Sequence, residues 1–88
     1  MIERVFQIKN RLGLHARPAA LFVQEAAKYK SSIVVVKDGL EVNGKSVMGL
    51  MLLAAESGSK LTIKADGLDE EKAIEAIGRI FDRKFDEA

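Results

Sequence analysis

The sequence predicts an α+β fold, in which four strands form an antiparallel sheet and three helices cover one of its faces. This is an open-faced two-layer sandwich in the order β-α-β-β-α-β-α. Segments in which apolar and polar residues alternate are interspersed with segments whose apolar residues recur every three or four positions. Asp-Gly and Asn-Gly pairs, which favour tight turns, separate several of them. The length of 88 residues suits a single domain that spans residues 1–88.

The first two elements are a strand over Ile2–Lys9 and a helix that begins at Ala16. In the strand, Phe6 and Ile8 are expected to face the core because polar residues alternate with them. Pro18 suits the first turn of the helix, where a missing backbone N–H costs no helical hydrogen bond. The apolar stripe of this helix is expected to contain Ala19, Phe22, Val23, Ala26 and Ala27.

The middle of the chain is expected to form a hairpin and then a short helix. The runs Ile33–Val36 and Leu40–Val42 are separated by an Asp-Gly pair, which is a strong signal for a tight hairpin. After a second turn, Ser46 is in the position of an N-cap for a helix over Val47–Ala55.

The last two elements are a strand over Leu61–Ala65 and a helix that Asp69 is expected to cap. Two glutamates follow Asp69, and negative charge is favourable at the first turn of a helix. The apolar stripe of this helix is expected to contain Ile74, Ile77, Phe81 and Phe85.

The composition excludes several classes of function. Fourteen basic and 13 acidic residues give a net charge of +1, which argues against nucleic-acid binding by a basic surface. The chain has no cysteine and one histidine, so cysteine and multi-histidine metal sites are excluded, and we expect no metal and no cofactor. We expect no membrane insertion and a cytoplasmic location, because no apolar run has spanning length and no signal peptide precedes the first strand.

The single histidine, His15, is the first candidate for chemistry. It precedes the first helix, where free backbone N–H groups and the helix dipole favour an anion such as phosphate. Arg17 adds a positive charge, and a neutral imidazole is a nucleophile. His15 is therefore either a phosphoryl acceptor or simply a polar residue near a helix start, and the spacing alone leaves both interpretations open.

Two motifs resemble those of one known family. The segment Gly13–Ala19, with the sequence GLHARPA, resembles the active-site motif of HPr, the histidine-containing phosphocarrier of the bacterial phosphoenolpyruvate-dependent phosphotransferase system. The segment Asn43–Met51 resembles the regulatory-serine segment of the same family. The resemblance covers essentially all 88 residues, and the presence of His15 argues against the carbon-regulation paralogue of the family, which lacks that histidine.

The resemblance implies a carrier and not a complete enzyme. His15 would receive a phosphoryl group on Nδ1 from the phosphoenolpyruvate-dependent first enzyme and would pass it to a downstream acceptor protein. Ala16 and Arg17 would offer backbone N–H groups, and the Arg17 side chain would offset the charge. The acceptors could belong to sugar uptake or to the nitrogen-related branch.

The resemblance also implies regulation at Ser46, by an HPr kinase/phosphorylase and with a catabolite-control transcription regulator as a further partner. The N-cap interpretation of Ser46 stands beside this one, because its hydroxyl can accept a helix N–H.

A docking surface is predicted beside these residues. Leu50 and Leu53 suit the core, which leaves other apolar side chains of the same segment exposed. The predicted docking residues are Val47, Met48 and Met51, together with Ala20, Gln24 and Ala27 on the adjoining flank of the first helix. The chain is expected to be a monomer.

Two other classes of function compete with the carrier. One is a small-ligand or regulatory binding module, because similar sandwiches serve many functions. The other is a single-stranded RNA binder, which needs exposed aromatic residues on its strands. Phe6 is the one aromatic residue in a predicted strand, and it is expected to face the core.

Overall fold

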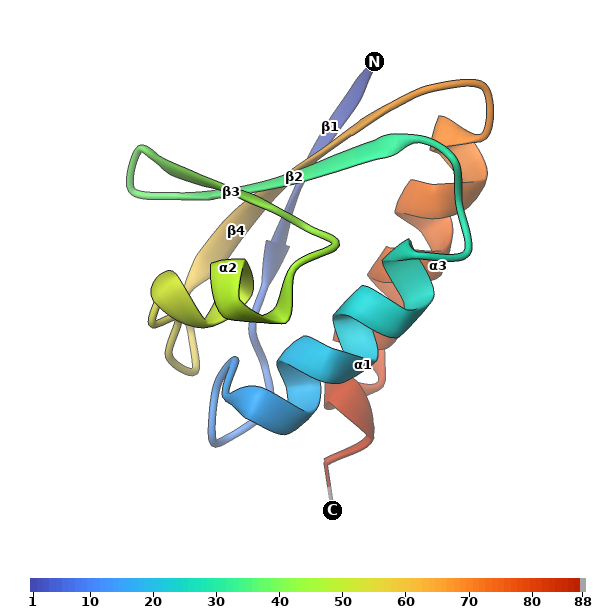
Figure 1. Ribbon diagram of the computed structural model, residues 1–88. Coiled ribbons are helices and arrows are strands. Elements are labelled where there is room, and N and C mark those ends of the chain that lie inside the picture. Colours follow the sequence, from blue (N-terminus) through green and yellow to red (C-terminus); the bar gives the residue numbers. More distant parts are fainter. Residues whose placement is uncertain (88) are drawn as a thin grey trace.

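The computed structural model describes residues 1–87 and has the seven predicted helices and strands in the predicted order, followed by a short 3₁₀ turn (Figure 1). The strands are β1 (Ile2–Gln7), β2 (Ser32–Lys37), β3 (Leu40–Asn43) and β4 (Lys60–Asp66). The helices are α1 (Ala16–Ala26), α2 (Val47–Leu52) and α3 (Glu70–Asp82), and the turn is η1 (Lys84–Asp86). Within residues 1–87, no helix combines the length and the hydropathy needed to cross a membrane.

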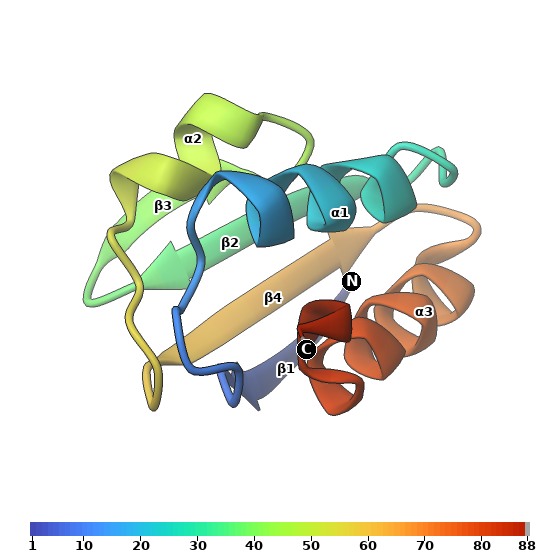
Figure 2. The ribbon, with the colours of Figure 1, turned by 90° about the horizontal axis from the view of Figure 1, so that it is seen from below.

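The sheet has the strand order β1-β4-β2-β3, and every neighbouring pair is antiparallel. All three helices lie on the same side of it (Figure 2). Because side chains alternate along a strand, one face of the sheet carries the apolar residues that the helices bury. These residues are Ile33, Val35, Leu61, Ile63 and Ala65. The predicted α+β sandwich is therefore confirmed.

The opposite face of the sheet is open to solvent. Lys64, in the centre of β4, lies 3.8 Å from a carboxylate oxygen of Glu3 and 3.6 Å from one of Glu41. Val5 is also on this face and is 61% exposed. Charged and β-branched side chains together cover the solvated side of the sheet.

Two predicted element ends are wrong by a few residues. The first strand ends at Gln7 instead of Lys9, although Ile8 is buried as predicted. The helix that begins after Ser46 ends at Leu52 instead of Ala55, because Ala54 has a positive φ of 49° and leaves the helical path. The carbonyl of Ala55 then accepts a hydrogen bond from Leu14 N–H, so tertiary pairing ends this helix.

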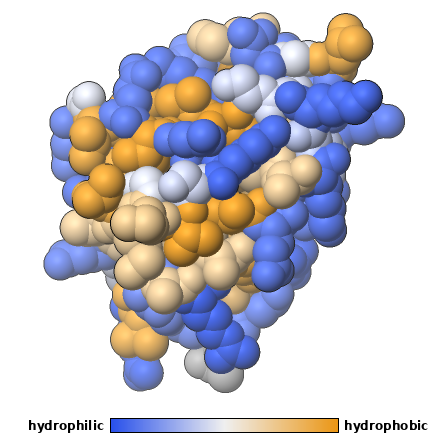
Figure 3. Space-filling view, in the orientation of Figure 1, coloured by the Kyte–Doolittle hydropathy of each residue, from blue (hydrophilic) through white to orange (hydrophobic). Residues whose placement is uncertain are grey.

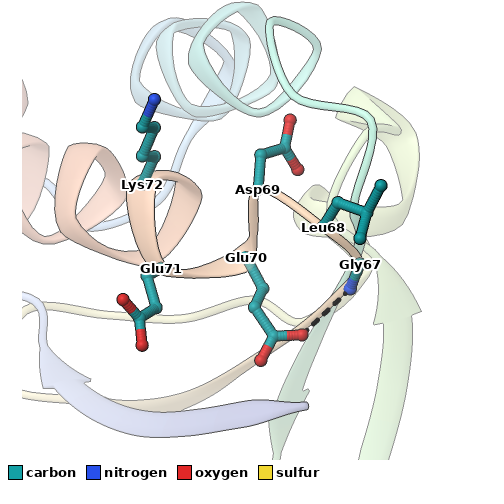
Figure 4. A pocket seen from close by; sticks show the side chains of 6 residues that line it. All are labelled: Gly67, Leu68, Asp69, Glu70, Glu71 and Lys72. Atoms are coloured by element: carbon teal, nitrogen blue, oxygen red, sulfur yellow. Dashed lines mark hydrogen bonds between the residues drawn. The ribbon is translucent and has the colours of Figure 1, made fainter.

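Asp69 is at the N-cap position of α3 as predicted, but its side chain does not cap the helix. Its carboxylate makes no capping bond and instead accepts hydrogen bonds from the Ser31 hydroxyl and from the backbone N–H groups of Lys30 and Ser31. The Ser31 hydroxyl is the main cause that lowers the pKa of Asp69 to about 2. The carboxylate of Glu70 accepts the N–H of Gly67 at 3.0 Å, in the turn that leads into α3 (Figure 4).

The end of the chain also differs from the prediction. Phe85 was expected in the stripe of the last helix, but α3 ends at Asp82. Lys84, Phe85 and Asp86 follow in the left-handed region, with φ values of 55°, 54° and 55°. The ring of Phe85 is nevertheless buried, with its centroid 5.0 Å from that of Phe81.

Candidate functional site

The loop before His15 is fixed by its backbone. Gly13 has a φ of +75°, and a Cβ there would lie 2.6 Å from the carbonyl oxygen of Ala55, so this position needs glycine. The buried side chain of Asn10 donates a hydrogen bond to the Gly13 carbonyl at 2.7 Å. Leu14 N–H donates to Ala55 at 2.9 Å. These contacts fix the backbone conformation of the loop that precedes His15.

His15 occupies the N-cap position of α1, with an extended backbone and an exposed side chain that makes no capping bond. The first N–H groups of a helix have no partner inside it. Pro18 has no N–H to offer, and Ala19 N–H already donates to the His15 carbonyl at 2.9 Å. The free donors of the first turn are therefore the N–H groups of Ala16 and Arg17, the pair named from the sequence.

Arg17 lies beside His15 in a shallow hollow. The hollow has a volume of ≈ 180 Å³ and is lined by Leu12, His15, Arg17, Pro18, Phe85, Asp86 and Glu87. Among residues 1–87, no carboxylate lies within ion-pair distance of the Arg17 guanidinium. The site thus combines an exposed imidazole, two unpaired amides and an unpaired cation, which suits a bound phosphoryl group.

One component of the site was missed by the sequence interpretation. Glu87 folds back on the loop before His15, and its carboxylate accepts the N–H of Arg11 at 2.6 Å and that of Leu12 at 3.2 Å. Burial favours the neutral acid, but these hydrogen bonds outweigh it and hold the pKa of Glu87 below its usual range. The partners are 75 and 76 residues apart in sequence, so no local pattern could have revealed the contact.

Ser46 is confirmed as a helix cap. Its hydroxyl oxygen accepts the N–H of Gly49 at 3.0 Å. The preceding residue, Lys45, donates its ammonium to the Tyr29 carbonyl at 2.7 Å, just beyond the C-terminal end of α1. Ser46 and His15 thus each occupy the N-cap position of a helix, Ser46 that of α2 and His15 that of α1.

The exposure predicted for the docking residues is partly confirmed, and their docking role stays a prediction. Met48 and Met51 are 79% and 45% exposed, and Gln24 and Ala27 are also exposed, whereas Ala20 is half-buried. Val47 was expected at the surface, but it packs against the core. Leu52, which was not predicted, is 73% exposed. Apolar surface gathers over α2 in Figure 3. We call Met48, Met51 and Leu52 the α2 patch.

Another depression, of ≈ 460 Å³, lies over Gly67–Lys72 at the start of α3 (Figure 4). The end of α3 leads into the hollow beside His15, so this depression is at the far end of the helix. It contains none of the residues that the sequence predicted for phosphoryl transfer, regulation or docking.

The comparisons with known proteins identify the family of this chain. The family model for the HPr component of the phosphotransferase system, described by its phosphorylation site, matches residues 2–83. The phosphocarrier protein HPr of Treponema pallidum is 47% identical over 87 residues, which is 99% of each chain. The HPr-like protein Crh of Halalkalibacterium halodurans is 53% identical over 77 residues, 88% of this chain and 92% of that one.

Solved structures give the same result. The crystal structure of HPr from Thermoanaerobacter tengcongensis matches with a TM-score of 0.96 and 50% identity, over 100% of this chain and 99% of that one. A second structure of the T. tengcongensis protein, described as a dimer, matches over 99% of this chain and 100% of that one, with 50% identity and a TM-score of 0.80. Sequence, fold and the surroundings of His15 lead to one conclusion: this chain belongs to the HPr family, the phosphocarriers of the phosphotransferase system, which are carriers and not enzymes.

Proposed function

We propose that His15 is the residue that carries the phosphoryl group, taking it from the phosphoenolpyruvate-dependent first enzyme and giving it to downstream acceptor proteins. The observation that carries the proposal is the position of His15, exposed at the start of α1 beside the unpaired N–H groups of Ala16 and Arg17. The HPr-like protein Crh is also similar in sequence. The resemblance implies that this paralogue lacks the histidine, so the presence of His15 favours the carrier.

The transfer step needs little from the protein beyond position and charge. The lone pair of Nδ1, the nitrogen that the family resemblance implies, attacks phosphorus. The new N–P bond forms as the bond to the donor group breaks, and the donor keeps that electron pair. The amides of Ala16 and Arg17 and the guanidinium of Arg17 stabilise the negative phosphoryl oxygens. Because the hollow is shallow, the partner protein supplies the rest of the enclosure.

The deciding experiment combines the purified protein with the first enzyme and phosphoenolpyruvate. We expect one acid-labile phosphate, at His15. His15→Ala is expected to lose the label while keeping its circular dichroism and melting temperature, because the ring is exposed and makes no capping bond. Full labelling of this variant would show that another residue is the acceptor.

We further propose that phosphorylation of Ser46 regulates docking. A phosphate adds a charge of about −1.5 to −2 at the start of a helix, where negative charge is favourable, so the fold is expected to persist. The added charge lies beside Met48 in the α2 patch and opposes association with an acidic partner surface. Incubation with ATP and an HPr kinase/phosphorylase, followed by mass spectrometry, tests whether Ser46 is the modified residue.

The partner surface and cellular setting follow from the same proposal. The α2 patch and the exposed flank of α1 are the docking surface for the first enzyme, the acceptors and a catabolite-control regulator, because exposed methionine side chains adapt to several partners. We propose that residues 1–88 act as one phosphocarrier domain in the cytoplasm. We propose a monomer as the active form. Sedimentation with and without the first enzyme distinguishes it from a dimer such as the one described for the T. tengcongensis protein.

A further inference from the structure

A hook at the end of the described chain, Lys84–Glu87, closes one side of the site. Three of its residues, Lys84, Phe85 and Asp86, have φ values between 54° and 55°. This left-handed conformation is unfavourable for residues other than glycine, and it persists where the surroundings impose it. The contacts of the hook with the rest of the protein are therefore what keep it in this conformation.

Two contacts hold the hook in place. Phe85 is 6% exposed and packs edge-on against Phe81, with ring centroids 5.0 Å apart. Two residues later, the carboxylate of Glu87 binds the N–H groups of Arg11 and Leu12 at 2.6 and 3.2 Å. The first contact ties the hook to the core, and the second ties it to the loop that leads into His15.

The Glu87 contact is a strong one for an exposed region. Hydrogen bonds from N–H groups to a charged carboxylate are shorter and stronger than those between neutral groups. Although burial opposes ionisation, the hydrogen bonds from Arg11 and Leu12 keep the pKa of Glu87 below its usual range. The carboxylate is therefore charged at neutral pH, when the carrier works.

The contact also anchors the part of the loop that Asn10 and Ala55 do not hold. Gly13 and Leu14 are held by Asn10 and by the Ala55 carbonyl. Arg11 and Leu12 have Glu87 as the partner of their N–H groups. The hollow is lined by His15 and Arg17 at the start of α1 and by Phe85, Asp86 and Glu87 from the hook, so the hook borders the space that a phosphoryl group would enter.

We infer that Glu87 is a positioning residue for phosphoryl transfer: it ties the loop before His15 to the hook and so fixes the imidazole relative to the rest of the hollow. The inference rests on the proposed function of His15 as acceptor. Glu87 touches neither the acceptor nitrogen nor the donor. It acts through the N–H groups of Arg11 and Leu12. Its effect is on the position of the His15 imidazole relative to the donor once the partner has bound, and not on the affinity of docking.

The test compares Glu87→Ala and Glu87→Gln with the control Asp86→Asn. Asp86 lines the same hollow, but its carboxylate pairs with Arg83 at 3.1 Å and does not bind the loop. Phosphoryl uptake is measured by rapid quench against the concentration of each variant, which separates the turnover number from the Michaelis constant. Amide chemical shifts of Arg11 and Leu12 report the contact itself, and circular dichroism reports folding.

Displacement of a reacting group by about 1 Å can cost on the order of 100-fold in rate, and a loosened loop displaces His15 part of the time. For Glu87→Ala we therefore expect a turnover number about tenfold lower with a Michaelis constant within about twofold of the original. Glu87→Gln is expected to recover part of the rate, because its amide oxygen can still accept one of the two hydrogen bonds. Asp86→Asn removes a charge from the hollow without touching the loop, so it is expected to lose less turnover than Glu87→Ala and to leave the Arg11 and Leu12 shifts in place.

Three results overturn the inference. The first is an unchanged turnover number for Glu87→Ala despite altered Arg11 and Leu12 shifts. The second is an equal loss in Asp86→Asn, which would assign the effect to charge in the hollow. The third is a change confined to the Michaelis constant, which would make Glu87 a docking residue. Failure of the proposed function has a different signature: the original protein would carry its acid-labile phosphate away from His15.

Discussion

Replacement of Gly13 by alanine tests whether the backbone contact beneath His15 is as tight as the structure indicates. Gly13 has a φ of +75°, and its new Cβ would meet the Ala55 carbonyl oxygen at 2.6 Å and the Glu56 Cα at 3.0 Å. Both neighbours are backbone atoms, which cannot rotate away as a flexible side chain can. The loop must therefore shift away from Ala55.

The expected cost has two parts. A left-handed conformation costs a residue with a Cβ roughly 1–2 kcal/mol. Separation of the loop from Ala55 also weakens the hydrogen bond from Leu14 N–H, now 2.9 Å long, and such a bond is worth about 0.5–1.5 kcal/mol. Together they predict a loss of about 2.5 kcal/mol, which lowers the melting temperature by roughly 10–20 °C in a domain of this size.

Gly39 provides a matched control. Its φ of +83° is similar, but nothing lies within 4 Å of a Cβ built there. Gly39→Ala therefore carries the conformational cost alone, about 1.5 kcal/mol, or roughly 6–12 °C. Thermal unfolding followed by circular dichroism gives both values, and phosphoryl uptake is expected to fall in Gly13→Ala and to stay unchanged in Gly39→Ala. Equal losses of stability in the two variants would refute the argument, because the contact with Ala55 would then contribute nothing.

Three further changes have expected outcomes. Because the pKa of Asp69 is lowered to about 2, the stabilising effect of its carboxylate is complete above pH about 4 and is lost as the pH falls toward 2. Acid titration of Asp69→Asn should therefore show a flatter loss of stability in this range. A profile equal to that of the original protein would contradict this assignment. Arg17→Ala should slow phosphoryl uptake at saturating first enzyme without abolishing it, since two amides remain, and a stopped-flow rate equal to the original would show that the guanidinium is not engaged. Ser46→Asp should raise the Michaelis constant of the first enzyme for this protein, with little change in melting temperature. Ser46→Ala should instead cost about 0.5–2 kcal/mol of stability through loss of the cap. Kinetics of Ser46→Asp identical to those of the original protein would show that Ser46 is not part of the docking surface.

The correct predictions for the site concern residues whose structural partners are close to them in sequence. Pro18 sets the helix start, His15 precedes it, and the Ser46 cap bonds to a residue three positions later. In each case the physical partner is a sequence neighbour, so spacing is a reliable guide. The same holds for the alternating strands, whose apolar faces are the faces that the helices bury.

The errors have a common origin in distant partners. Asp69 has the residue type of a cap, but the N–H groups it binds are 38 and 39 residues away. The apolar run after Ser46 continues through Ala55, yet the pairing of Ala55 with Leu14 ends the helix earlier. Glu87 gives no local signal at all. A single sequence contains the residue types for such contacts but not their pairing, which depends on how the elements pack.

The start of two separate helices at His15 and Ser46 has a consequence for molecules that carry both phosphates. His15 is at the N-terminus of α1 and Ser46 is at that of α2. A helix N-terminus favours negative charge, so each phosphate would be stabilised by its own helix dipole. A doubly phosphorylated molecule is therefore electrostatically accessible. Any strong antagonism between the two modifications is then expected to arise in the complex, from a partner that contacts the starts of both helices.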